Sequence, residues 1–253
     1  MQGLKHHAFI KTIYNKENRG VNYTRNRGIE IAAQKYILFL DSDDELIPGS
    51  LEKVKEAITT NADTIHFLFV VSDRAEHFRQ VTDIKRINYE DWVSGAVSGD
   101  FTHVVLTEVM KKYLFFEEFR MFEHLNWLRV KKETSPQLLI PVVTTQRDRD
   151  RSDSLTTSGK LKSVSVIKSR FEAEKLYYSL YHKDLNLYNP KSLTFKLIET
   201  ISLGVACNQR RSCRPLIAYA NGAHIKFLGN LIMMLPSSFI KYGIIRYSGL
   251  KGR

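Results

Sequence analysis

Four of the five residues from 41 to 45, Asp-Ser-Asp-Asp-Glu, are acidic, and they directly follow the apolar run at residues 36–40. Unbroken apolarity over this length predicts a strand buried on both faces, as in a parallel sheet. Carboxylates this close repel one another and raise each other's pKa unless a cation neutralises them. Mg²⁺ or Mn²⁺ suits that role, because both ions prefer carboxylate oxygens and keep positions open for phosphates. The alternative is a solvated acidic loop that stabilises the first turn of a helix at residues 50–58.

The residues around this segment predict an element that would position it. A turn at residues 18–20 leads into a helix that runs from an N-cap at Asn22 to about Gln34. Gly28 lies inside this helix and suggests close approach of a strand or ligand, because glycine there costs about 1 kcal/mol relative to alanine. Open α/β sheets bind ligands beyond the carboxyl ends of their strands, where the acids stand. The Asp-x-Asp spacing of Asp41 and Asp43 favours a metal–phosphate site over the solvated loop.

Three short sequences together resemble the inverting family-two glycosyltransferases, which have the GT-A fold and make bacterial capsule, lipopolysaccharide and related polysaccharides. They are RNRGI at residues 25–29, YILFLDSDD at residues 36–44, and the proline at residue 48. The resemblance implies a nucleotide-sugar donor held through a divalent metal, Mg²⁺ or Mn²⁺, at Asp43, with Asp41 closer to the nucleoside. It also implies that Arg25 and Asn26 contact the donor, although Asn26 equally suits a structural hydrogen bond at that turn.

A second segment, FRMFEHLNWLRV at residues 119–130, resembles the family segment in which a Glu-Asp pair opens a helix. In the family, the acid there is the general base that deprotonates the acceptor hydroxyl. Here the pair is Glu123-His124, so a histidine replaces the second acid. Either side chain can accept a proton, because the unperturbed pKa of histidine is about 6.5 and burial raises that of glutamate. Glu123 is the first candidate for the base and His124 the second, while a helix-capping Glu123 with a surface His124 is an equal alternative.

Residues 151–156, RSDSLT, loosely match a third family segment, which ends in Arg-x-x-Ser-Leu-Thr and lies near the donor diphosphate. Arg151 would contact phosphate there, since a guanidinium binds phosphate through two parallel hydrogen bonds. The alternation of Arg and Asp over residues 147–151 is, however, typical of a solvated loop that neutralises itself, and the sequence favours this interpretation.

Several other residues are predicted to be structural. Strands are expected at residues 63–71 and 138–143, the second at a sheet edge because of Pro141, and a helix at residues 104–113. His66 lies within the first of these strands and is expected to be a satisfied core residue. Trp127 is expected to pack in the core, although an indole also suits stacking on a sugar face.

The net charge of +11 predicts anionic partners. The sequence has no recognisable RNA- or DNA-binding module, so a membrane surface or a diphosphate-linked substrate is preferred over nucleic acid. Cys207 and Cys213 fit no common zinc spacing and are expected to be free thiols in a reducing cytosol. We find no signal-peptide pattern and no apolar run long enough to predict a spanning helix.

The predicted organisation is a GT-A core of the α/β class, Rossmann-like, over residues 1–158, followed by a helical region over residues 159–253. Helices are expected at residues 164–182, 193–204 and 218–235. The end of the chain, residues 237–253, mixes basic with aromatic and aliphatic residues. This mixture suits an interfacial helix on anionic lipid, and it equally suits a helical appendage packed on the core.

Family-two enzymes begin with a strand–helix–strand unit that holds the nucleotide base, and such a unit takes about 30 residues. Only residues 1–17 precede the turn at residue 18, so we expect an N-terminally incomplete core. The expected function is inverting, metal-dependent transfer of a sugar from a nucleotide sugar to a hydroxyl of a lipid-linked glycan in surface polysaccharide biosynthesis. The expected location is the cytoplasm, at the inner face of the cell membrane. The alternative is a non-catalytic truncated remnant that acts as a basic membrane-surface or partner-binding module.

Overall fold

A computed structural model describes the chain except for residues 1–9, 80, 120–121, 148–162 and 251–253. The chain divides into two compact units, which we call the sheet unit (residues 1–86 and 100–147) and the helical unit (residues 87–99 and 148–253). The predicted boundary at residue 158 lies outside the described residues. Residues 87–99 group with the C-terminal half, which the sequence did not indicate.

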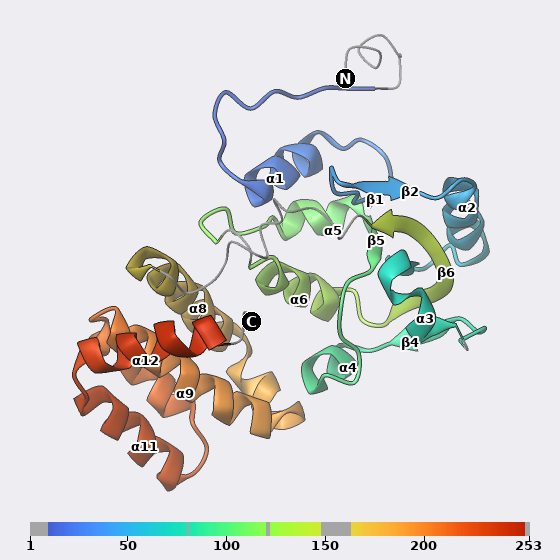
Figure 1. Ribbon diagram of the computed structural model, residues 1–253. Coiled ribbons are helices and arrows are strands. Elements are labelled where there is room, and N and C mark those ends of the chain that lie inside the picture. The colour runs from blue at the N-terminus through green and yellow to red at the C-terminus, as the bar shows by residue number, and fades with distance from the viewer. Residues whose placement is uncertain (1–9, 80, 120–121, 148–162, 251–253) are drawn as a thin grey trace. The chain divides into compact units, whose positions relative to one another are not determined.

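The sheet unit is built on a mixed sheet, six-stranded within the described residues (Figure 1). Its strands are β1 (Tyr36–Leu38), β2 (Asp44–Leu46), β3 (His66–Val71), β4 (Lys85–Ile87), β5 (Thr102–Leu106) and β6 (Gln137–Arg147). The order is β1-β5-β3-β6-β2, with β4 also paired to β6. β3 and β6 run parallel, whereas β1–β5, β3–β5 and β2–β6 are antiparallel. The predicted α/β core is confirmed, with both kinds of strand pairing.

Helices cover both faces of this sheet (Figure 1). Helix α2 (Ser50–Thr60), predicted from the sequence, lies on one face, and α1 (Val21–Ile31), α5 (Thr107–Lys112) and α6 (His124–Glu133) lie on the other. The cluster under α2 is Val54, Ala57, Phe67, Phe69, Val104, Leu138 and Ile140. The opposite cluster is Ile29, Val105, Met110, Phe115 and Val130. The short η2 (Ser72–Arg74) and α3 (Ala75–Phe78) follow β3.

Strand β1, which precedes the acidic segment, differs from its prediction. It lies at an edge of the described sheet, pairs antiparallel with β5, and is only partly buried. Its side chains do reach both layers, because Tyr36 and Leu38 pack against the cluster under α2 while Ile37 and Phe39 pack against the other. The apolar run therefore reflects contact with both layers, and the edge position accounts for the partial exposure.

Two strand assignments near the middle of the sheet also need correction. Strand β6 lies between β3 and β2 and is not the predicted edge strand. Its Pro141 is tolerated because the pairing with β3 shifts between Ile140 and Val143, so this residue falls in an irregularity. The helix predicted from residue 104 begins only at Thr107, because residues 104–106 pair with β1 and β3. Tertiary pairing thus overrides the local pattern.

Helix α1 begins after Gly20, so the prediction of Asn22 as its N-cap is wrong. Asn22 is buried inside the helix, where its Nδ2 donates to the carbonyls of Phe116 at 2.8 Å and Phe119 at 3.0 Å. The helix ends at Ile31, before the predicted Gln34. A Cβ on Gly28 would meet no atom within 4 Å, so no strand among the described residues approaches this glycine closely, and the alternative of a ligand there stays a prediction.

The helical unit confirms the predicted helical C-terminal region. Its helices are α4 (Tyr89–Ser94), α8 (Val164–Tyr188), α9 (Pro190–Ala206), α10 (Arg210–Tyr219), α11 (Ala223–Met234) and α12 (Ser237–Leu250). The helix predicted at residues 218–235 is interrupted, because Gly222 adopts a positive φ of 94° before α11 begins. Cys207 and Cys213 are free thiols, as expected. A Cβ on Gly204 would collide with the Cys213 Sγ and the Phe171 ring, so α8, α9 and α10 meet closely there.

Helix α4 is joined to this bundle by polar contacts. The hydroxyl of Tyr89 donates to Asp184 Oδ2 on α8 at 2.7 Å. The Nδ2 of Asn189, at the junction of α8 and α9, donates to the carbonyl of Ser94 at 2.9 Å. Tyr89 and Val93 are themselves buried. These contacts explain why residues 87–99 group with the C-terminal helices.

His66 is a core residue, as predicted, and is part of a buried polar chain. Its Nδ1 lies 2.9 Å from Thr134 Oγ1, and its Nε2 lies 2.8 Å from Nδ1 of the buried His103. The Trp127 indole stacks on His103 with ring centroids 4.0 Å apart. Burial, with a smaller effect of the Lys131 ammonium, lowers the pKa of His66 to about 3, and burial also lowers the pKa of His103. Both imidazoles are therefore neutral at neutral pH.

We predict that acid weakens the sheet unit well before the carboxylates titrate. The folded-state pKa values of His66 and His103 lie below the unfolded value. The unfolded chain therefore binds more protons below about pH 6.5, and stability falls as pH falls. The free energy of unfolding should decrease by up to about 1.4 kcal/mol per pH unit for each histidine between about pH 6.5 and 5.5. Urea unfolding monitored by Trp127 fluorescence, in a Trp92→Phe background, measures this slope.

The control for this prediction is His66→Gln, which removes one titrating group and can still hydrogen bond. Its stability should change with pH by roughly half as much as that of the Trp92→Phe parent. A free energy of unfolding that is the same at both ends of this pH range would contradict the prediction.

Candidate active site

The guanidinium of Arg25 joins two of the acids predicted from the sequence. Arg25, on α1, donates from Nη2 to Asp41 Oδ1 at 2.6 Å, and its Nη1 lies 3.7 Å from Glu123 Oε1. The guanidinium carbon also lies 5.6 Å from the centroid of the Phe115 ring. The fold thus brings together three predicted site residues, of which Arg25 and Glu123 are about 100 positions apart in the sequence.

Helix α6 begins at His124, so the Glu-His pair opens a helix as the sequence predicted. The carbonyl of Glu123 accepts from the backbone N–H groups of Asn126 and Trp127, at 3.0 Å each. The carboxylate of Glu123 faces Arg25, whereas His124 is exposed and its ring centroid lies 6.0 Å from that of Phe122. Of the two candidates for the base, the structure places Glu123 beside the Arg25–Asp41 pair.

The other predicted site residues have different surroundings. Asn26 is buried, and its amide contacts the backbone carbonyl and N–H of Phe115 at 2.9 and 2.8 Å and Glu117 Oε1 at 3.2 Å. Its contacts are those of the structural alternative considered for this residue. Asp43 is exposed in the loop after β1. Arg151 lies outside the described residues.

A second arginine gathers carboxylates that sequence reasoning missed. Arg147 is the last residue of β6, and the antiparallel register places it opposite Asp44 of β2. Its Nε lies 3.8 Å from Asp44 Oδ2, and its Nη1 lies 4.0 Å from Asp73 Oδ2. The same Nη1 donates to Asp100 Oδ2 at 2.8 Å. This cluster adds Asp73, Asp100 and Arg147 to the acidic end of the sheet.

Signals for part of this cluster were present in the sequence. The apolar strand at residues 66–71 runs directly into Ser72-Asp73, in the same order as the apolar run before Asp41. Because β3 ends at Val71, this acid also follows a strand end. Arg147 was assigned to the alternating Arg/Asp loop, although it pairs as the last residue of a long strand.

Burial and neighbouring acids both act on the pKa of Asp44. Burial raises the pKa of Asp44, the Arg147 guanidinium lowers it, and Asp41, Asp43 and Asp73 raise it further, with a net rise. Carboxylate oxygens under mutual repulsion fit a hard divalent cation. Within the described residues, no group of three or more His, Cys, Asp or Glu side chains is placed to hold a metal ion. A cation there would take its other ligands from phosphate or water.

The Trp127 indole packs against other aromatic rings of the sheet unit. Besides the stack on His103, it makes edge contacts with Phe39 at 5.3 Å and with Phe115 at 5.5 Å between ring centroids. The core-packing expectation for this residue is therefore confirmed.

The family model for glycosyl transferase family 2 matches residues 2–120, which include the acidic segment, Arg25 and most of the sheet unit. The match places this segment of the chain in that family. The resemblance inferred from the sequence is thereby confirmed, and the α/β core followed by helices is the fold that it implied.

Two of the individual proteins to which this chain is similar are bacterial glycosyltransferases. An uncharacterized glycosyltransferase of Haemophilus influenzae is 26% identical over 75% of this chain and 72% of that protein. A GalNAc(5)-diNAcBac-PP-undecaprenol beta-1,3-glucosyltransferase of Campylobacter jejuni is 24% identical over 50% of this chain and 43% of that protein. The crystal structure of S. aureus TarS 1-349 covers 94% of this chain and 74% of that chain with a TM-score of 0.48 and 12% identity.

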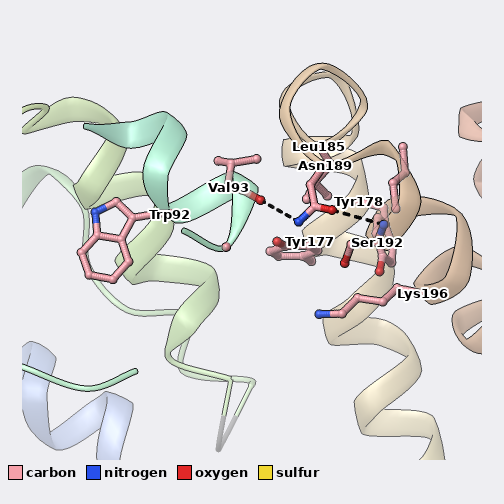
Figure 2. A pocket seen from close by; sticks show the side chains of 10 residues that line it. Trp92, Val93, Tyr177, Tyr178, Leu185, Asn189, Ser192 and Lys196 are labelled. Atoms are coloured by element: carbon pink, nitrogen blue, oxygen red, sulfur yellow. Dashed lines mark hydrogen bonds between the residues drawn. The ribbon is translucent and has the colours of Figure 1, made fainter. Parts of the chain in front are cut away.

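The helical unit contains a separate cavity of about 190 Å³. Figure 2 shows Asn189 among the residues that line it, where its side chain contacts the carbonyl of Val93 and the backbone N–H of Ser192, each at 3.2 Å. Tyr177 and Lys196 also line it. None of these residues was predicted as part of a site, and the cavity belongs to the junction of α4 with α8 and α9.

We predict that Arg147→Met destabilises the sheet unit, because it removes the guanidinium that lies beside the Asp44 and Asp73 carboxylates. The free energy of unfolding should fall by about 2 kcal/mol, in the range measured for loss of a partner from partly buried charges. The matched control, Arg147→Lys, retains the charge and loses the planar fork, and should cost less than half as much. Urea unfolding followed by Trp127 fluorescence gives both values. Equal losses in the two variants would show that charge is not the cause.

Proposed function

We propose that this family 2 glycosyltransferase transfers a sugar from a nucleotide-sugar donor to a hydroxyl of a glycan acceptor, with inversion at the anomeric carbon. The observation that carries the proposal is the meeting of Arg25, Asp41 and Glu123 beside the acidic segment. This arrangement supports a donor-side acid and an acceptor-side base held by one guanidinium. Family membership supports the donor class and the reaction.

On the donor side, the proposed roles are those that the resemblance assigned. Asp43 would hold a Mg²⁺ or Mn²⁺ ion, and its exposure leaves room for the ion and a diphosphate. When bound, such an ion supplies positive charge that stabilises the departing phosphate. Asp41, fixed by Arg25, would lie toward the nucleoside. Arg151 remains a proposed phosphate contact.

On the acceptor side, Glu123 is the proposed general base and His124 the second candidate. The acceptor hydroxyl gives its proton to the carboxylate as its oxygen bonds to the anomeric carbon, and the bond from that carbon to the nucleoside diphosphate breaks. Attack from the face opposite the leaving group inverts the configuration. The ion pair with Arg25 holds the carboxylate beside the donor acids, which supports this role.

The proposed acceptor is a lipid-linked glycan of a bacterial surface polysaccharide, such as capsule or lipopolysaccharide. The name of the Campylobacter relative, which specifies an undecaprenol-linked acceptor, supports this class. An enzyme with such a substrate would work at the cytoplasmic face of the membrane. The second candidate function is a non-catalytic basic module at a membrane surface or on a partner. The nucleotide-binding experiment would favour it if the folded chain binds no nucleotide.

The donor site is tested by calorimetric titration of UDP and GDP into the full chain, with and without Mn²⁺. We expect one of the nucleotides to bind only with the ion, and Asp43→Asn to weaken binding at least about tenfold, since a carboxylate ligand is lost. The matched control is Glu45→Gln, an exposed acid two positions further along, which should leave the affinity unchanged. Failure of a folded chain to bind either nucleotide with Mn²⁺ would overturn the donor site.

The base is tested by slow hydrolysis of the donor sugar, in which water replaces the acceptor. Glu123→Gln should lower the rate at least about a hundredfold, the usual contribution of a general base. His124→Gln should leave the rate within about threefold, because Glu123, and not the exposed His124, is the proposed acceptor of the proton. A larger loss in the histidine variant would reverse the assignment.

A further inference from the structure

The C-terminal part of the chain has an extreme charge pattern. Glu199 is the last acidic residue, and residues 200–253 contain eight Lys and Arg with no Asp or Glu. This segment alone therefore has a charge of +8 (8 − 0), against +11 for the whole chain. The described cations lie in α10, α11 and α12. Such a segment attracts an anionic surface of any kind, and the charge alone does not identify which.

The same helices expose large apolar side chains. On α11, Phe227 is 70% exposed, Leu231 46% and Met234 83%. Their spacing of four and three residues places them on one face of the helix. On α12, Phe239 is 66% exposed and Tyr242 64%, again three residues apart. Large apolar residues that are exposed together on one helix face mark an interaction surface more often than a solvated one.

Helix α11 is apolar on its opposite side as well, where it packs into the bundle. Gly229 and Ile232 are buried there, and a Cβ on Gly229 would lie 3.2 Å from Ile217 of α10. The bundle contact is therefore already made by one face of α11. The exposed face is left for a second apolar environment.

The junction between α11 and α12 is a sharp bend that side-chain hydrogen bonds hold in place. Within the described residues no single helix is long and apolar enough to cross a membrane, whereas Ala223–Met234 and Ser237–Arg246 together meet the criteria of length and composition but are bent by 105°. Arg210, from α10, donates from Nε to the Met233 carbonyl at 3.0 Å and from Nη2 to the Leu235 carbonyl at 2.6 Å. Its Nη1 donates to Ser237 Oγ at 2.8 Å.

These contacts satisfy carbonyls that the end of a helix would otherwise leave without partners. Unpaired backbone groups are costly in lipid, so a bend that enters a bilayer needs partners of its own. Arg210 supplies them from within the protein. The bend is thus suited to the boundary between headgroups and acyl chains.

We propose that α11 and α12 bind an anionic lipid bilayer as a bent pair that enters one leaflet. Phe227, Leu231, Met234, Phe239 and Tyr242 would enter the acyl boundary, and Lys226, Lys241 and Arg246 would contact lipid phosphates. We assign lipid as the partner because the partner must bind both the exposed apolar side chains and a segment that has cations and no acids. An anionic leaflet offers acyl chains for the first and phosphates for the second. The inference goes beyond glycosyl transfer and does not depend on it.

The experiment is cosedimentation of the full chain with vesicles of phosphatidylcholine, with or without phosphatidylglycerol at roughly one lipid in three. We expect binding that rises at least about tenfold with the anionic lipid, since each cation near the surface contributes about fivefold. The double variant Phe227→Ser/Met234→Ser should lower binding at least about tenfold. The matched control is Phe195→Ser, which replaces a phenylalanine on α9 that is 73% exposed and should change nothing.

Insertion is separated from surface adsorption by a Phe227→Trp variant and vesicles whose acyl chains carry bromine. Quenching of the added fluorescence, relative to the unsubstituted chain, supports entry into the leaflet, and no added quenching would overturn it. Equal binding to both vesicle types, or unchanged binding by the double variant, would also overturn the proposal. Nucleotide binding by the double variant should be unchanged, so failure here is distinguishable from failure of the donor site.

Discussion

The arrangement of the candidate site depends on one guanidinium. Arg25 is held on α1 and reaches both the acid that follows β1 and the acid that opens α6. Helix α1 is itself fixed by two buried asparagines, Asn22 and Asn26, which bind the backbone of residues 115–119. Polar contacts inside the protein thus determine where the arginine lies. Because its two acids come from different elements, small shifts of α1 would change the distances from the guanidinium to both.

The sequence predicted those parts of the site in which a local pattern of residues also carries recognisable chemistry. The apolar run before Asp41, the helix that opens at His124 and the arginine at residue 25 could all be found by type and spacing. Asp73 and Arg147 could not be placed beside Asp44, because that proximity follows from the pairing of β6 with β2 and with β3. Pairing between strands distant in sequence has no local signature.

The errors at Asn22 and Pro141 have a related cause. A capping residue and a buried side-chain amide have the same sequence signature, and only the packing of α1 on residues 116–119 distinguishes them. A proline was assigned to an edge strand by rule, but an irregularity in the β3–β6 pairing accommodates it inside the sheet. In both cases the residue type was informative, and the tertiary environment determined its role.

The insertion of residues 87–99 into the helical unit has a consequence for exchanging parts between relatives. Tyr89 and Val93 of α4 are buried, and α4 is bonded to Asp184 and Asn189. A chimera joined at residue 147 would therefore combine one protein's α4 with another protein's α8 and α9. Recombination that preserves the packing has to transfer two chain segments together, residues 87–99 and 148–253, with junctions near residues 86, 100 and 148. The bundle is thus inherited as a discontinuous module, although most of it is contiguous in sequence.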